Sequence, residues 1–259
     1  MARKGKNMIK GKSIFTRAVH AGERGPKPDF QPVSTPIYST VGYRYESMED
    51  LDRIFGNERD GYVYARYGSP TNAALEEALA IMEEAEAALS FGSGMAAVYA
   101  ALLAAGGKNG ASLVAAYDLY GATYAICARL LPDMGAKVKF VDVTNLEELG
   151  KTLSETKPVA VILETISNPL MKVADIPTIC QMAHRVGAKV IADSTFTTPV
   201  LLQPLKHGAD FSVHSTTKYI GGHGDVLGGA IISSKENRSK LYEIIKMTGG
   251  NLGPFEAWL

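Results

Sequence analysis

The sequence has little cysteine and no excess of charge of either sign. Cys127 and Cys180 are the two cysteines among 259 residues, too few for a disulfide framework or a cysteine-based metal cluster. Lys and Arg together number 27, and so do Asp and Glu, so the net charge is close to zero. Binding to nucleic acids or membrane surfaces usually depends on a basic excess. The composition therefore predicts neither partner, and a reducing cytoplasm is the expected location.

Long apolar runs and the common ligand signatures are also missing. The longest apolar runs, such as 96–105, are too short to cross a bilayer, and the basic first 13 residues lack the apolar core of a secretion signal. No GxxxxGK[ST] pattern is present, and the run 106–112 has the wrong spacing for a nucleotide P-loop. The five histidines lack a tight spacing with a carboxylate, so no metal site is expected.

Glycine is abundant by contrast, with 26 residues, many of them in short clusters between apolar runs. Around these clusters, apolar strand-like runs alternate with helix-like runs. This alternation predicts an α/β fold with a mostly parallel sheet and helices on both faces. Strands are expected at 88–91, 112–116, 137–143, 158–165, 188–194, 210–216 and 228–234, and helices at 69–86, 92–107, 120–135, 145–154 and 175–187.

The stretch 1–61 differs from the rest of the chain. Pro26, Pro28, Pro32 and Pro36 fall within it, and little helical periodicity appears before Met48. Because proline fixes φ and removes a donor, neither a long helix nor a central strand is expected there. We therefore predict an extended arm at 1–61 that lies across another surface, a cofactor-binding domain at 62–248 and a linker that begins at 249–259.

Chemically active residues follow several of the predicted strands, where α/β sheets bind their ligands. A helix start with Gly92 and Gly94 could hold a phosphate, or could be a tight turn without a ligand. Asp193 ends an apolar run and could pair with a cationic ring nitrogen, or could cap a helix.

Lys218 lies among hydroxyls in a glycine-rich segment, so it could form an imine with a carbonyl cofactor, or could be an ordinary solvent-exposed lysine. Ser215 and Thr217 beside it could bind a phosphate. An amine, an acid and a phosphate cradle together are what pyridoxal 5′-phosphate (PLP) requires.

Six segments of the sequence resemble the Cys/Met-metabolism family of PLP-dependent enzymes. They are YARYGSPT, FGSGMAA, LYGATY, ETISNP, ADSTF and HSTTKYIGGHGD, and the resemblance runs from about Phe15 to the last residue. It implies an aspartate aminotransferase-like fold (fold type I), PLP as cofactor, an amino-acid substrate and a homo-oligomer, expected as a homotetramer, whose active site is shared between two subunits.

The resemblance also implies a role for individual residues. Lys218 would hold the cofactor as a Schiff base and move protons, and Tyr120 would stack on its ring and act as a base or acid. Tyr64 and Arg66 would reach the phosphate of the neighbouring subunit. The cofactor-binding set is Tyr64, Arg66, Gly94, Met95, Tyr120, Glu164, Asn168, Asp193, Ser215, Thr217 and Lys218.

The resemblance implies elimination or γ-replacement on sulfur amino acids or activated homoserine. Cystathionine-handling relatives often carry an arginine where this chain has Ala125, which favours a methionine γ-lyase-like or O-acylhomoserine sulfhydrylase-like enzyme. Methionine γ-lyases, however, typically carry a cysteine at the position of Ala122. Family members continue into a C-terminal domain whose arginine grips the substrate carboxylate. A truncated or degenerate cofactor-binding relative without turnover, or another PLP enzyme such as an aminotransferase or decarboxylase, stays open.

Overall fold

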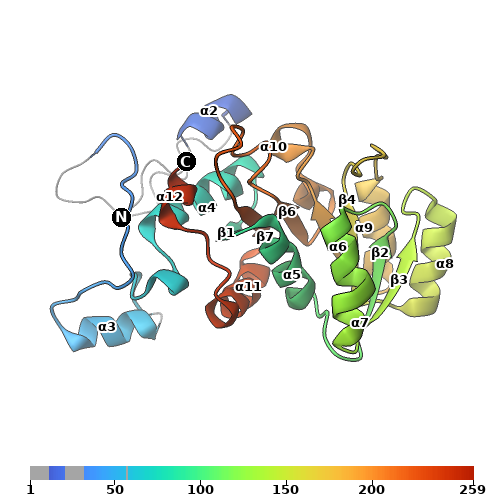
Figure 1. Cartoon of the computed structure of the whole chain (residues 1–259), viewed down its shortest axis with the longest axis horizontal. Helices are drawn as coiled ribbons and strands as arrows, with labels where there is room; N and C mark the ends of the chain where they lie inside the picture. Colours follow the sequence, from blue (N-terminus) through green and yellow to red (C-terminus); the bar gives the residue numbers. More distant parts are fainter. Residues whose placement is uncertain (1–11, 21–31, 57) are drawn as a thin grey trace.

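The computed structural model describes residues 12–20, 32–56 and 58–259, so Pro26 and Pro28 of the predicted arm lie outside the described residues. A seven-stranded sheet forms the centre of the molecule (Figure 1). Its strands are β1 (Ala87–Phe91), β2 (Ser112–Ala116), β3 (Lys137–Val141), β4 (Ala160–Glu164), β5 (Lys189–Asp193), β6 (Phe211–His214) and β7 (Gly229–Ser233).

The strand order is β1-β7-β6-β5-β4-β2-β3. β7 runs antiparallel to β1 and β6, whereas the other pairs are parallel. Every residue of β4 is buried, while β3 at the edge alternates between more exposed and less exposed residues. Because the inner strands are buried on both faces, they appear in the sequence as continuous apolar runs. The mostly parallel sheet predicted from the sequence is confirmed.

Helices cover both faces of the sheet, as predicted. Leu79 and Ala80 of α4 (Pro70–Met82) pack with Ala88 of β1 in a small apolar cluster. Leu89, the next residue of β1, belongs to the main core together with α5 (Gly94–Ala104). Because successive side chains of a strand point to opposite faces, α4 and α5 lie on opposite sides of the sheet.

Side-chain caps fix where the longer helices begin. In each case the capping oxygen accepts the backbone N–H three residues further on, which satisfies a donor that the first turn leaves free. The capped helices are α3 (Met48–Phe55), α4, α5, α8 (Leu146–Thr156), α9 (Ile176–Arg185) and α11 (Lys235–Thr248), with caps Ser47, Ser69, Ser93, Asn145, Asp175 and Ser234.

The helix predicted at 120–135 is continuous but not uniform. It runs from α6 (Gly121–Ala125) through a wider π-turn at Ile126–Leu130 to α7 (Leu131–Asp133). Pro132 follows that wider turn. Because proline lacks a backbone donor, it disturbs the regular helical ladder on its N-terminal side.

The predicted arm contains two short helices, α2 (Ile14–His20) and α3, so it is less extended than the sequence indicated. Arg17 docks α2 on the end of α4, where it donates to the carbonyl of Ile81 at 2.8 Å and pairs with Glu84 at 2.9 Å. The described part of the arm therefore contacts its own chain, both through the buried side chain of Arg17 and through hydrogen bonds such as that from the N–H of Tyr38 to the hydroxyl of Thr71 at 2.9 Å.

The remaining short elements are α10 (Thr198–Leu201), a 3-10 turn at Pro204–His207 and α12 (Pro254–Trp258). α12 packs on α4 at the end of the chain. The side-chain amide of Asn72 donates to the carbonyl of Leu252 at 3.0 Å, and the N–H of Gly92 donates to the carbonyl of Gly250 at 2.8 Å. The segment predicted as the start of a linker thus folds back beside the strand-to-helix turn after β1.

Candidate functional site

The candidate site lies where β4, β5 and β6 end side by side. These strands are parallel neighbours, and Glu164 at the end of β4 pairs in register with Asp193 at the end of β5. Asp193 in turn lies opposite Val213 of β6, two residues before Ser215. Parallel pairing therefore places residues 164, 193 and 215 at one edge of the sheet, as expected for a ligand site in an α/β fold.

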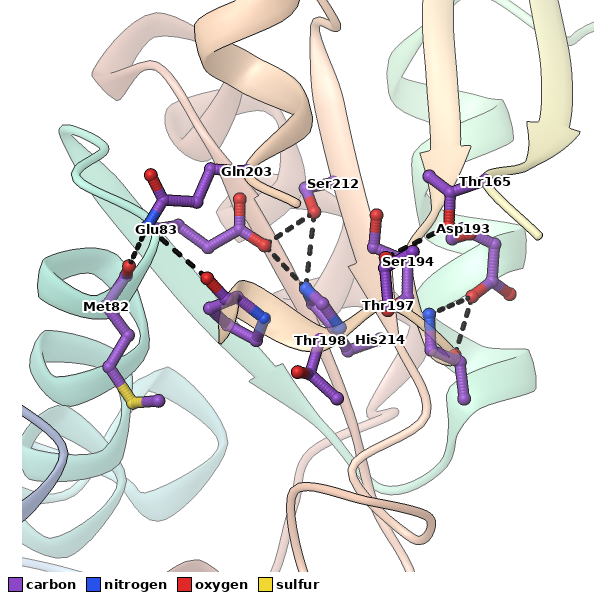
Figure 2. Close-up of polar contacts among 12 residues, drawn as sticks. Met82, Glu83, Thr165, Asp193, Ser194, Thr197, Thr198, Gln203, Ser212 and His214 are labelled. Carbon is purple, nitrogen blue, oxygen red and sulfur yellow. Dashed lines mark hydrogen bonds and ion pairs between the residues drawn. The ribbon is translucent and has the colours of Figure 1, made fainter. Parts of the chain in front are cut away.

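Thr195 joins Asp193 to the segment that follows β6. Its hydroxyl donates to Oδ1 of Asp193 at 2.6 Å and accepts the backbone N–H of Ser215 at 2.9 Å. The backbone N–H of Thr195 also donates to Oδ1 at 3.0 Å. These contacts hold one oxygen of the carboxylate in place, as the dashed lines at Asp193 in Figure 2 show.

The second carboxylate oxygen of Asp193 is open to a ligand. In the described part of the chain, Oδ2 receives no hydrogen bond. Burial raises the pKa of Asp193, against the lowering effects of the Thr195 hydrogen bonds and of the nearby His214. Burial outweighs these effects, so the charged form of Asp193 would gain from a cation in contact with it, and a protonated ring nitrogen at Oδ2 would supply one. The environment of Asp193 therefore fits a pyridinium ring.

The start of α5 has the local structure expected of a phosphate cradle. Ser93 caps this helix, and Gly94 is its first residue, so unpaired backbone donors face away from the helix at this point. A Cβ on Gly94 would come within 2.8 Å of Cβ of Ser215 and 2.9 Å of its Oγ. Ser215 can lie against the helix start because residue 94 is glycine, and Met95 follows as the second residue of the helix. A phosphate bound here would lie next to the first turn of α5 and Ser215.

Lys218 lies three residues after Ser215, in the turn between β6 and β7, and is exposed. Its backbone N–H donates to the carbonyl of Ser215 at 3.1 Å. The hydroxyl of Thr217 donates to the carbonyl of Gly228 at 3.1 Å and accepts the N–H of the same residue at 3.0 Å. The Thr217 hydroxyl thus anchors the turn. A hydrogen bond from it to a phosphate would either be added to its contacts with Gly228 or replace them.

Glu164 connects the two loops that carry Tyr120 and Asn168. One of its carboxylate oxygens accepts the backbone N–H of Tyr120, and the other accepts that of Asn168 at 3.0 Å. Burial and the neighbouring charges of Asp193 and Asp118 raise the pKa of Glu164 to about 7, although the two backbone hydrogen bonds oppose the rise. The ring of Tyr120 is half exposed, and Asn168 is exposed. Their side chains are free to meet a ligand while their backbones are fixed.

Tyr64 and Arg66 lie in a different environment. Arg66 donates to the carbonyl of Lys246, and its guanidinium lies over the rings of Tyr64 and Tyr67, at 5.4 and 5.0 Å from their centroids. Together with Glu76, Arg66 and Tyr67 also line a cavity of about 110 Å³. The structure therefore ties these residues to α11 and α4, and it does not bring them into contact with Asp193 or Ser215.

A fully buried polar cluster lies behind the site. Nε2 of His214 is 2.6 Å from Oε1 of Glu83, which also accepts the hydroxyl of Ser212 at 2.9 Å (Figure 2). The side chains of Glu83 and His214 have no exposed surface. The cluster ties the end of α4 to the last residue of β6, immediately before Ser215, so it supports the strand that leads to Lys218.

Sequence reasoning missed Thr195 and Glu83. In the segment ADSTF, the sequence singles out Asp193 and possible helix-capping residues. The contacts of Thr195 with both Asp193 and Ser215 depend on β6 lying next to β5. Glu83 is 131 residues from His214 in the sequence, and nothing local links the two. In the described residues, no group of three His, Cys, Asp or Glu side chains is placed to hold a metal ion. No described helix is both long and apolar enough to cross a bilayer.

Comparison with known proteins decides the family. The model of the family described as Cys/Met metabolism PLP-dependent enzyme matches residues 15–259. This chain belongs to that family. Its cofactor is PLP and its fold is that of the type I PLP enzymes, as the sequence predicted.

Three relatives show how close the similarity is. An L-methionine gamma-lyase of Fusobacterium nucleatum subsp. polymorphum is 40% identical over 95% of this chain and 62% of its own length. An O-succinylhomoserine sulfhydrylase of Mycobacterium tuberculosis is 40% identical over 89% of this chain and 56% of its own. A putative O-acetylhomoserine (thiol)-lyase structure from Campylobacter jejuni, with N′-pyridoxyl-lysine-5′-monophosphate, has a TM-score of 0.87 and 28% identity, over 95% of this chain and 68% of that one.

The chain spans 56 to 62% of the length of these two curated relatives. The open Oδ2 of Asp193 and the glycine at the start of α5 fit the two ends of PLP, so the site geometry agrees with the family cofactor.

Proposed function

We propose that this chain binds PLP through Lys218 and, with it, catalyses elimination or γ-replacement on a sulfur amino acid or an activated homoserine. The observation that carries the proposal is the Thr195 hydroxyl, which holds Asp193 and Ser215 in one hydrogen-bonded unit. That unit fixes the distance between Asp193, the acid that would pair with the ring nitrogen, and Ser215, which lies beside the expected phosphate site. Relatives named as methionine gamma-lyase and O-succinylhomoserine sulfhydrylase support the reaction class.

PLP, when bound, supplies an electron sink for the bonds at the α-carbon of an amino acid. Asp193 maintains a negative charge at Oδ2, which favours a protonated ring nitrogen and so strengthens that sink. The start of α5 and Ser215 hold the phosphate, and the exposed face of Tyr120 covers the ring. Nζ of Lys218, once free, takes a proton from one substrate carbon and delivers it to another or to the leaving group.

The substrate we favour is methionine or an O-acylated homoserine rather than cystathionine. Ala125 ends α6, where the cystathionine-handling relatives often carry an arginine for a distal carboxylate. Without that cation, a second carboxylate on the substrate would lose its partner. Ala122, in the first turn of α6, differs from the cysteine typical of methionine γ-lyases, so the two favoured classes remain separate candidates.

We also propose that the active site is completed by a second copy of the chain in a homo-oligomer, expected as a homotetramer. Tyr64 and Arg66 of one copy would reach the phosphate held by α5 of the other. In support, the side chains of both residues lie on a partly exposed surface beside α11, and their described contacts do not include α5, Ser215 or Lys218.

The experiment that tests the function is a substrate panel with the PLP-loaded chain. Methionine, cystathionine, cysteine and the O-acylated homoserines with sulfide or methanethiol are supplied, and 2-oxo acid, ammonia and thiol are measured. We expect 2-oxo acid, ammonia and methanethiol from methionine, or, from an O-acylated homoserine, homocysteine with sulfide and methionine with methanethiol. Amine transfer or carbon dioxide release without either product would overturn the proposal in favour of an aminotransferase or a decarboxylase.

Cofactor binding without turnover is the second candidate. The observation behind it is that the chain spans 56 to 62% of two curated relatives. In this case the chain would bind PLP at Lys218, yet no member of the substrate panel would release product. Any measurable 2-oxo acid from methionine that depends on Lys218 excludes this candidate.

A further inference from the structure

Two loops at the carboxyl edge of the sheet carry Tyr120 and Asn168, two of the residues expected to contact the cofactor. Residues 117–120 follow β2 and end in Tyr120, and residues 165–172 follow β4 and include Asn168. β2 and β4 are parallel neighbours, so both loops leave the same edge of the sheet. Their spacing would determine how Tyr120 and Asn168 meet one ligand.

Glu164 connects these two loops from its position at the end of β4. It is the last residue of β4 and is 8% exposed, so its carboxylate is enclosed between them. Each carboxylate oxygen accepts one backbone N–H, from Tyr120 in one loop and from Asn168 in the other. Tyr120 precedes α6 and has no side-chain capping bond, so the contact with Glu164 fixes the backbone where the helix begins.

The loops meet a second time at the surface, through Lys172. Its ammonium lies 2.7 Å from Asp118 in the first loop and 3.2 Å from Asp142, which follows β3. These side chains are partly exposed, so this contact is weaker than the enclosed one. The buried carboxylate is therefore the main connection between the loops.

We propose that Glu164 is the positioning residue that sets the spacing between Tyr120 and Asn168, by accepting one backbone N–H from each loop. The positioning role rests on the proposed cofactor site, whereas the two hydrogen bonds to Glu164 do not depend on it. A glutamine at position 164 would keep one acceptor and point an amide N–H₂ at one of the two backbone donors. One loop would then lose its tie, while the residue would keep nearly the same size.

The contact should titrate near neutral pH. The charged groups around Glu164 are Asp193 on β5 and Asp118 in the first loop, and Tyr120 is the other titratable neighbour. Lys172 lies beyond Asp118, with which it pairs. Burial raises the pKa of Glu164 to about 7, whereas water entering the opened loops would return the group to its ordinary value near 4.5. The closed arrangement thus binds the extra proton. Its stability is full below about pH 4.5 and is lost as the pH rises toward 7.

The test is hydrogen–deuterium exchange of the cofactor-free chain, followed by mass spectrometry of peptides covering 117–125 and 165–172. After correction for intrinsic exchange, both segments should lose about tenfold or more of their protection between pH 5 and pH 7. Glu164→Gln should abolish that pH dependence and expose at least one segment about tenfold more at pH 5, where the wild-type acid is neutral and both of its oxygens can still accept. Equal protection in wild type and variant at pH 5 overturns the proposal.

Glu76→Gln is the matched control. Glu76 is also an enclosed carboxylate with a pKa raised by burial, and it accepts the N–H and the hydroxyl of Ser90 at 3.0 and 2.8 Å. It lies on α4, away from both loops, so this variant should keep the wild-type exchange at 117–125 and 165–172. If Glu164→Gln fails to fold, Glu164→Asp takes its place: it keeps the carboxylate but draws both oxygens back by one methylene, so both segments should lose protection at pH 5, and unchanged protection overturns the proposal.

A second measurement uses pyridoxamine 5′-phosphate, which binds without bonding to Lys218. Its dissociation constant should rise several-fold in Glu164→Gln and stay unchanged in Glu76→Gln. An unchanged affinity in Glu164→Gln would show that the loop spacing does not serve the ring and would overturn the positioning role. Because exchange is measured without cofactor, failure of the proposed function and failure of this contact remain distinguishable.

Discussion

The surroundings of Asp193 and those of Arg66 are built in opposite ways. At Asp193, three neighbouring parallel strands end together, and Thr195 and Ser215 form one connected set of hydrogen bonds. Arg66 lies in a short 3-10 turn and is held by the carbonyl of Lys246 and by aromatic rings. The first region is assembled by the sheet itself, whereas the second rests on contacts between distant surface segments.

This difference indicates which functions a single chain can fulfil. The Asp193 region should bind the ring and phosphate of the cofactor with residues of one chain. The Arg66 region should matter only when a second copy brings it to the phosphate. Substitutions in the two regions should therefore have effects of different size and different dependence on assembly.

Lys218→Ala should have the largest effect. Loss of the amine removes both the covalent attachment and the proton carrier, so turnover should fall at least about a thousandfold. Product release from the best substrate measures the effect, and the visible absorption of bound cofactor should change with it. Lys240→Ala on the exposed face of α11, where Lys240 pairs with Glu236, should change neither. Turnover above a tenth of wild type in Lys218→Ala would contradict the role.

Asp193→Asn should come next, with turnover reduced about a hundredfold, because a neutral amide cannot hold a proton on the ring nitrogen. Burial raises the pKa of Asp193, so the charged acid is costly without a cationic partner. The thermal midpoint of the cofactor-free variant at pH 8 should therefore be no lower than that of the wild type. A large loss of stability with intact turnover would contradict the assignment.

Thr195→Val should weaken cofactor binding about tenfold, because it removes the hydroxyl shared by Asp193 and Ser215. Thr195→Ser keeps the hydroxyl and serves as the control, with affinity expected within about threefold of wild type. Equilibrium titration with PLP measures both. A loss in Thr195→Ser as large as that in Thr195→Val would contradict this role of the hydroxyl, which serine keeps.

The sequence predicted the strands well because the inner strands are short, continuous apolar runs. β2 was predicted at its observed bounds, Ser112–Ala116, and α4 and α5 were predicted from Pro70 and Gly94 near their starts. The long helix α11 was missed, since its charged sequence shows little apolar periodicity beyond Leu241 and Ile245. Thr195 and Glu83 could not be found because their partners are brought to them by sheet pairing and by the packing of α4.

The Arg66 region is tested by mixing a variant with weakened cofactor binding and an inactive variant, at a PLP concentration that leaves the first largely without cofactor. Arg66→Ala alone should weaken cofactor binding about tenfold through loss of a phosphate contact. If the site is shared, a hybrid of Arg66→Ala and Lys218→Ala chains contains one site with both residues intact. Unfolding and refolding the two variants together should then raise activity several-fold above that of the separately refolded variants. No gain in a verified hybrid would contradict the shared site.

The most direct measurement is borohydride reduction of the PLP-loaded chain, followed by proteolysis and mass spectrometry. The account predicts that the pyridoxyl phosphate group appears on Lys218, in the turn directly after Ser215. Recovery of the group on another lysine, or no covalent attachment at saturating PLP, would contradict it.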